Sequence, residues 1–217
     1  MFNAGGISAF VFDMDGVLLD TESLCKKCWR LAAEKWNLKG VDEVYYQCVG
    51  QSDQDTLFAL QNFFEKQNEN FNVREWYDYA RNLFRKTEEG EGIELMPGAK
   101  NCLERLKNKG FILALASSTR RQAVERQLSR AGLIDYFETL TCGDSVEHSK
   151  PDPEIYLRAC SSVGIDPKNC VAVEDSPNGV LSAYNAGLKV ILVPDQIKPD
   201  EKIKSLCAKI LNSLEEI

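Results

Sequence analysis

The stretch AFVFDMDG, residues 9–16, decides the fold class, because an apolar run ends abruptly in two acids and a glycine. Four consecutive apolar residues before a turn are typical of a strand that is buried on both faces of a parallel sheet. In such sheets the ligand site lies at the carboxyl ends of the strands. We therefore expect Asp13 and Asp15 to lie at the functional edge of an α/β domain.

The chain from residue 97 onward repeats this pattern, with helical segments between the apolar runs. The further strand candidates are Phe111–Ala116, Thr139–Cys142, Cys170–Val173 and Val190–Val193. Helical spacing of apolar residues predicts a helix before Gly110 and others at about 120–131, 154–163 and 177–186. Strands that alternate with helices at these spacings imply a parallel sheet.

Residues 22–91 have a different composition from the rest of the chain. They contain all three tryptophans, no proline and only three glycines. A proline-free, glycine-poor segment with apolar residues at helical spacing predicts helices, of which we expect about four. This helical unit is inserted after the first strand.

Polar residues also follow the other strand candidates. They are Ser117-Ser118-Thr119, the loop Lys150-Pro151-Asp152-Pro153, and Glu174-Asp175-Ser176. Each group alone is explained by local structure, because such residues commonly cap helices or form turns. Since the carboxyl ends of parallel strands meet at one edge, the groups together predict a single site with carboxylates, hydroxyls and a lysine.

With these motifs in this order, the sequence resembles the haloacid dehalogenase-like hydrolase superfamily, in its β-phosphoglucomutase-like branch of phosphatases and mutases. The motifs that carry the resemblance are Asp13-Met14-Asp15-Gly16-Val17, Ser117, Lys150 and Glu174-Asp175. The resemblance covers nearly the whole chain. It implies a Rossmann-like three-layer α/β core formed by residues 1–18 and 94–217, with residues 19–93 as an inserted helical cap domain.

The resemblance also implies roles for individual residues. Asp13 would attack phosphorus and form an aspartyl-phosphate, and Asp15 would act as general acid and then as base. Mg²⁺ would be bound by Asp13, the Asp15 backbone carbonyl and Asp175, with Glu174 binding the ion or supporting its ligands. The residues expected to bind the substrate are Lys150, Ser117 and Ser118 on the phosphoryl group, and Thr21 and Glu22 toward the leaving group. Capping of a first cap helix is an equal explanation for Thr21.

Two departures from the mutases favour simple hydrolysis. Cys25 stands where β-phosphoglucomutases carry a histidine that assists proton transfer. The first cap loop, Gly50–Asp53, places an acid where those mutases have an arginine for a second phosphate. We therefore expect a phosphatase that acts on a small phosphorylated metabolite such as a sugar phosphate.

The alternatives to this function are a phosphomutase, a receiver-like signalling module and a dehalogenase. A phosphomutase is the closest rival, because it would use the same aspartyl-phosphate. A receiver-like signalling module, which accepts phosphate on an aspartate, is disfavoured by the helical insertion and by the acid at Asp15. Dehalogenases of the superfamily lack that second aspartate.

Composition limits the partners of the chain. The net charge is -7, which disfavours nucleic-acid binding. No apolar run approaches the length of a membrane helix, and the N-terminal residues lack the pattern of a secretory signal. We expect a cytoplasmic monomer whose eight cysteines are reduced and serve mainly in packing.

Overall fold

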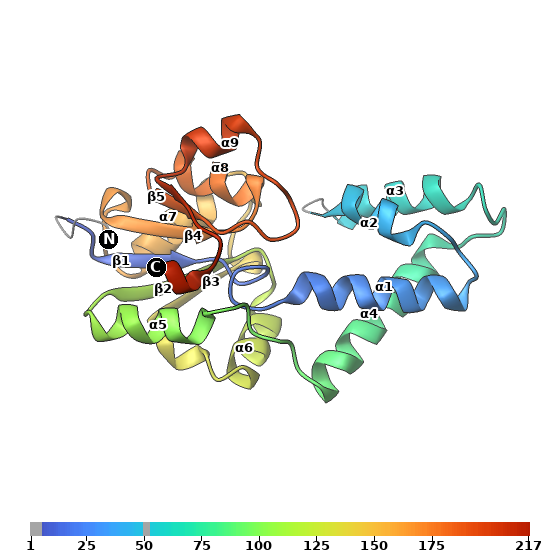
Figure 1. Cartoon of the computed structure of the whole chain (residues 1–217), viewed down its shortest axis with the longest axis horizontal. Coiled ribbons are helices and arrows are strands. Elements are labelled where there is room, and N and C mark those ends of the chain that lie inside the picture. The colour runs from blue at the N-terminus through green and yellow to red at the C-terminus, as the bar shows by residue number, and fades with distance from the viewer. Residues whose placement is uncertain (1–5, 50–52) are drawn as a thin grey trace. The chain divides into compact units, whose positions relative to one another are not determined.

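The computed structural model describes residues 6–49 and 53–217, and its centre is a parallel sheet of six strands (Figure 1). The strands are β1 (Ala9–Phe12), β2 (Ile112–Ser117), β3 (Thr139–Cys142), β4 (Cys170–Glu174), β5 (Lys189–Leu192) and β6 (Lys209–Ile210). Their order across the sheet is β3-β2-β1-β4-β5-β6, and every adjacent pair is parallel. The predicted α/β fold with a parallel sheet is confirmed, and β1 lies at its middle.

Helices cover both faces of this sheet, as Figure 1 shows. One face carries α7 (Glu154–Ser162) and α8 (Pro177–Asn185), and the other carries α5 (Ala99–Asn108) and α6 (Arg121–Arg130). α9 (Glu201–Leu206) packs against α8. Strands buried on both faces need apolar side chains at every position, which explains the continuous apolar runs of β1 and β2.

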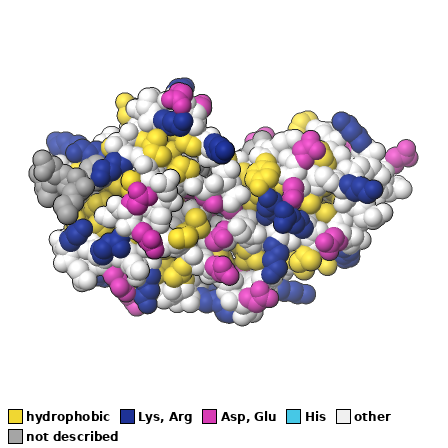
Figure 2. All heavy atoms as spheres, viewed as in Figure 1, with side chains coloured by type: hydrophobic (Ala, Val, Ile, Leu, Met, Phe, Trp, Pro, Cys, Tyr) yellow, Lys and Arg dark blue, Asp and Glu magenta, His cyan; other side chains and the backbone are white. Residues whose placement is uncertain are grey.

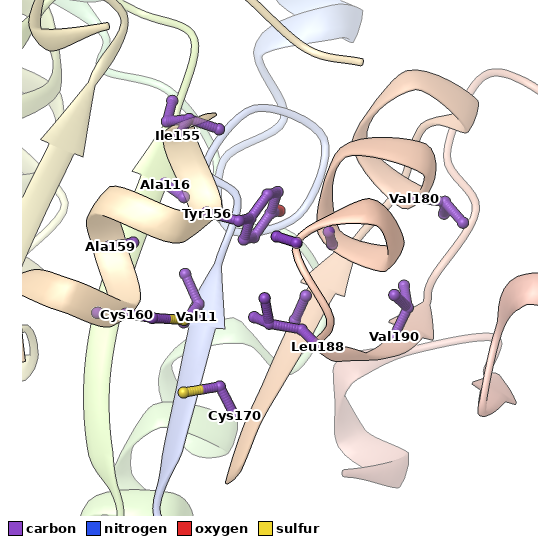
Figure 3. Close-up of a cluster of buried hydrophobic side chains, with 14 of the residues drawn as sticks. Val11, Ala116, Ile155, Tyr156, Ala159, Cys160, Cys170, Val180, Leu188 and Val190 are labelled. Carbon is purple, nitrogen blue, oxygen red and sulfur yellow. The ribbon is translucent and has the colours of Figure 1, made fainter. Parts of the chain in front are cut away.

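A hydrophobic core fills the layer between the sheet and the α7–α8 face. Figure 3 shows Tyr156, Ala159 and Cys160 reaching from α7 into this cluster, while Val11 and Cys170 come from the strands. All of these residues are at most 1% exposed, so the layer is packed as a dry interior. The eight cysteines, all within the described part of the chain, are free thiols.

Residues between β1 and β2 form a second compact unit, Thr21–Ile93, separate from the unit that contains the sheet. Its helices are α1 (Thr21–Lys35), α2 (Val41–Cys48), α3 (Asp53–Phe64) and α4 (Val73–Gly90). An aromatic core holds them together, with Trp29 packed edge-on against Tyr45 and Trp76, and Phe64 against Trp76. The helical unit therefore has a hydrophobic core of its own.

The two segments that join the units run side by side within the sheet unit. Leu19 and Leu95 form an antiparallel bridge, and the Asp20 N–H donates to the Glu94 carbonyl at 2.9 Å. The chain thus leaves the sheet unit and returns to it at neighbouring points.

Charges are spread over the surface of the protein. Figure 2 shows acidic and basic side chains interspersed over the face in view. None of the helices among the described residues is both long and apolar enough to span a bilayer.

Candidate active site

Asp13 and Lys150 form the centre of a polar cluster at the carboxyl edge of the sheet. Asp13 directly follows β1, and its amide donates to the Val173 carbonyl of β4, which fixes the turn. Lys150 Nζ donates to Asp13 Oδ1 at 2.7 Å and to Glu174 Oε1 at 2.6 Å. A further hydrogen bond runs from Nζ to the Ala116 carbonyl at 3.1 Å. The lysine therefore uses all three of its donors to tie three neighbouring strands together.

Asp15 has different partners from Asp13, although only two residues separate them. Thr119 Oγ1 donates to Asp15 Oδ2 at 2.8 Å, and Ser117 Oγ lies 3.4 Å from the same oxygen. The Thr119 amide in turn donates to Ser117 Oγ at 3.1 Å. One carboxylate thus faces an ammonium group and the other faces hydroxyls, so the two acids have distinct electrostatic surroundings.

Glu174 ends β4 and is completely buried. Besides Lys150, its carboxylate accepts hydrogen bonds from Tyr156 Oη at 2.7 Å and from Ser176 Oγ at 3.2 Å. A Cβ on Gly179, in the first turn of α8, would stand 1.9 Å from the Glu174 carboxyl carbon. Only a glycine lets α8 start this close to the buried acid.

The carboxylates of this cluster repel one another. Burial raises the pKa of Asp13 to about 7. The positive charge of Lys150 acts to lower this pKa, and the negative charge of Glu174 acts to raise it. Burial, followed by repulsion from Glu174 and Asp13, also raises the pKa of Asp175 well above its usual range. Burial lowers the pKa of Lys150, but the charges of Asp13 and Glu174 outweigh it and raise that pKa overall. The cluster carries more negative charge than one ammonium group neutralises.

The donor set fits a hard divalent cation. Oxygen atoms of Asp13, Glu174 and Asp175 all lie within 4.8 Å of one another. Carboxylate oxygens are the ligands that Mg²⁺ prefers, and a dication would offset the excess negative charge. A Cβ on Gly16 would stand 2.6 Å from Asp175 Oδ2, and its φ of +72° suits glycine. The turn after β1 is therefore shaped to admit the Asp175 carboxylate.

The structure brings most of the predicted residues of the sheet unit together. Asp13, Lys150, Glu174 and Asp175 lie together, Ser117 contacts Asp15, and the charge of Asp15 acts on Asp13. Ser118 follows Ser117 and is exposed. His148, the single histidine of the chain, is also exposed and lies 3.3 Å from Glu154 Oε2.

The predicted residues of the helical unit stand at the start of α1. Thr21 is buried, and its hydroxyl has no hydrogen-bond partner among the described residues. The Glu22 carboxylate accepts a hydrogen bond from Tyr45 Oη of α2. Cys25 is half-buried at the edge of the aromatic core. Gly50, Gln51 and Ser52 of the predicted first cap loop lie outside the described residues.

Three functional candidates have no assigned role in the sequence predictions. Thr119 belongs to the predicted hydroxyl group that begins at Ser117, and it makes the shorter hydrogen bond to Asp15. Tyr156 lies in the first turn of α7 on its buried side, where nothing in the local sequence distinguishes it from a core aromatic. Asp195 follows β5 and so stands at the same sheet edge, but its closeness to Asp175 depends on β5 lying next to β4.

Residues 10–193 match the sequence profile of the haloacid dehalogenase-like hydrolases. This chain belongs to that family. A Thermotoga maritima protein named phosphorylated carbohydrates phosphatase is 36% identical over 188 residues, covering 85% of this chain and 84% of the relative. The Bacillus subtilis β-phosphoglucomutase is 28% identical, with 84% and 81% covered.

A solved structure shows the same fold. It is a HAD family hydrolase from Deinococcus radiodurans R1 that holds bound phosphate and sodium. The two chains share 26% identity and superimpose with a TM-score of 0.81, over 97% of this chain and 93% of the other. The hydrolase membership and the β-phosphoglucomutase-like character predicted from the motifs are both confirmed.

Proposed function

We propose that this hydrolase is a Mg²⁺-dependent phosphatase that cleaves a small phosphorylated metabolite, with sugar phosphates as the favoured class. The observation that carries the proposal is that two neighbouring acids, Asp13 and Asp15, have different hydrogen-bond partners. Lys150 pairs with Asp13, whereas Thr119 and Ser117 surround Asp15. Different partners suit different roles, with Asp13 as the nucleophile and Asp15 as the group that transfers the proton.

In the first step, an oxygen of Asp13 attacks phosphorus while the bond from phosphorus to the leaving oxygen breaks. Asp15 gives its proton to that leaving oxygen, which departs as an alcohol. In the second step, water attacks the aspartyl-phosphate, and Asp15 takes one of its protons as the bond to Asp13 breaks. Splitting one displacement into two lowers each barrier. The Asp13 carboxylate and inorganic phosphate are the products of the second step.

Charge is the main obstacle to the first step, because a carboxylate approaches a phosphate dianion. Two like charges about 4 Å apart repel by roughly 4 kcal/mol at an effective dielectric near 20. Mg²⁺ held by Asp13, Asp175 and the Asp15 carbonyl would supply the compensating charge, with Glu174 beside it. Ser117 at the end of β2, Ser118 after it, and Lys150 in the loop after β3 would hold the phosphoryl oxygens.

We assign the helical unit, Thr21–Ile93, the role of a cap that selects the substrate. Its connection to the sheet unit is a pair of adjacent segments, an arrangement that suits hinge motion. Thr21 and Glu22 begin this unit, a few residues along the chain from the turn that carries Asp13 and Asp15. They are therefore the candidates for contacting the leaving group. The buried Thr21 hydroxyl without a partner supports a polar role there.

Phosphate release from a panel of phosphorylated metabolites tests the proposal. We expect Mg²⁺-dependent release that EDTA abolishes and that Asp13→Asn eliminates, with sugar phosphates among the best substrates. Glu125→Gln, which changes an exposed acid on α6, is the matched control and should remain active. Absence of release from the whole panel by the wild type would contradict phosphatase activity and favour a phospho-accepting module.

A phosphomutase is the second candidate, because one relative is a β-phosphoglucomutase. A hexose 1-phosphate supplied with a bisphosphate activator separates the two activities. We expect inorganic phosphate as the product. Conversion to hexose 6-phosphate without net phosphate release would establish mutase activity instead.

A further inference from the structure

A further carboxylate, Asp195, lies beside the proposed cation site. It follows β5, whose register pairs Leu192 with Glu174 at the end of β4. Asp195 Oδ2 stands 3.4 Å from the point that a Cβ on Gly16 would occupy, and Asp175 Oδ2 stands 2.6 Å from the same point. The two carboxylate oxygens therefore lie on the same side of the Gly16 turn, no more than about 6 Å apart.

One oxygen of Asp195 has a donor and the other does not. Gln196 Nε2 donates to Oδ1 at 2.9 Å. Oδ2 is buried and has no hydrogen-bond partner among the residues that the structure describes. A buried acceptor without a donor destabilises the folded state, so an oxygen kept in this state points to a donor that binds with a ligand.

The charged groups around Asp195 indicate which kind of donor would bind to its Oδ2. The charge of Asp195 repels the Asp175 carboxylate, and the charge of Asp20 repels Asp195. A neutral side chain would relieve this repulsion, yet the chain places an acid here. Mg²⁺ keeps several of its waters when proteins bind it, and a water polarised by the ion is a strong donor to a carboxylate.

We propose that Asp195 is a positioning residue of the cation site: its Oδ2 accepts a hydrogen bond from a water carried by Mg²⁺ bound at Asp13 and Asp175. Asp195 thereby raises the affinity for Mg²⁺ and fixes the orientation of the hydrated ion. This inference rests on the proposed metal-dependent function and adds to it a residue outside the motifs. Groups that support metal ligands in this way typically contribute about 10- to 100-fold to affinity.

Titration of Mg²⁺ into the metal-free full-length protein, followed by calorimetry, tests the inference. We expect Asp195→Asn and Asp195→Ala each to weaken Mg²⁺ binding by about 10- to 100-fold. The asparagine keeps the shape of the side chain and an acceptor for Gln196, but it presents an amide where the water needs an acceptor. Glu201→Gln removes the same charge from an exposed position at the start of α9 and should bind Mg²⁺ as the wild type does.

Thermal unfolding of the metal-free proteins separates positioning from a structural role. The midpoint of Asp195→Asn should equal or exceed that of the wild type, because a repulsive charge is gone, while the upward shift caused by Mg²⁺ should shrink. A metal-free midpoint below that of the wild type, or unchanged Mg²⁺ affinity in both Asp195 variants, would overturn the inference. If either of these two outcomes is found while Asp175→Asn abolishes Mg²⁺ binding, only the role of Asp195 is overturned and the proposed function stands. Failure of the wild type to bind Mg²⁺ would instead overturn both.

Discussion

At the scale of single residues, Glu174 shows how a buried charge is kept in place. Its carboxylate is completely buried and is held by Lys150 and by the hydroxyl of Tyr156. Tyr156→Phe removes one donor and leaves the ring in the core. We expect the free energy of unfolding to fall by about 1.5–3 kcal/mol, the range for hydrogen bonds to charged groups, as measured by urea denaturation. Tyr184→Phe, at a half-exposed position of α8, is the control and should change little.

Thr119 offers a second prediction at this scale, this time for activity. Its hydroxyl donates to Asp15 Oδ2 at 2.8 Å, and the valine side chain has the same shape without a donor. If Asp15 transfers the proton, Thr119→Val should reduce kcat about tenfold or more, since a hydrogen bond to a charged group is worth about 1.5–3 kcal/mol. Thr119→Ser should recover most of the loss. Equal kcat values for the valine and serine variants would contradict a role for the hydroxyl.

Several of the residues that the sequence identified stand directly after an apolar run, whereas Lys150 lies in a longer loop after β3. Asp13, Ser117 and Asp175 were predictable because strand ends are visible in the sequence and parallel strands share an edge. Tyr156 was not, because an aromatic residue on the apolar side of a helix looks the same whether or not its hydroxyl meets an acid. Asp195 requires knowledge that β5 lies next to β4, which is a property of sheet order.

At the scale of elements, the regular alternation of strands and helices was predicted more completely than the C-terminal end of the sheet. β1 and β3 have the predicted bounds and β4 extends one residue further, whereas β2 and β5 are each displaced by one residue at both ends. β6, at Lys209–Ile210, was not predicted, because two residues give no periodicity and an edge strand needs little burial. The short α9 was missed for the same reason, since six residues span fewer than two turns.

The start of α8 provides a prediction at this scale. A Cβ on Gly179 would stand 1.9 Å from the Glu174 carboxyl carbon, so Gly179→Ala must push the helix away from the buried acid. We expect a loss of about 3 kcal/mol in the free energy of unfolding, together with weaker Mg²⁺ binding. Gly90→Ala, at the end of α4, meets no atom within 4 Å and should be neutral or slightly stabilising. Similar stabilities for the two variants would mean that α8 moves freely relative to β4.

At the scale of the whole molecule, the chain consists of two units whose cores share no residue. One core packs aromatic side chains of α1–α4, and the other packs aliphatic residues between the sheet and α7–α8. The sequence predicted a helical insertion from its tryptophans and from its lack of proline. It did not reveal that the two connecting segments pair with each other, because a single bridge between Leu19 and Leu95 leaves no repeating pattern.

Separate cores and paired connections predict that the sheet unit folds without the insertion. The Asp20 N–H and the Glu94 carbonyl are 2.9 Å apart, so a linker of about three glycines can replace Thr21–Ile93. We expect the shortened chain to unfold in one cooperative thermal transition by far-ultraviolet circular dichroism. It should also lack tryptophan emission, because Trp29, Trp36 and Trp76 all lie in the removed segment. A broad transition with strong binding of a hydrophobic dye would show instead that the sheet unit depends on the helical unit for its packing.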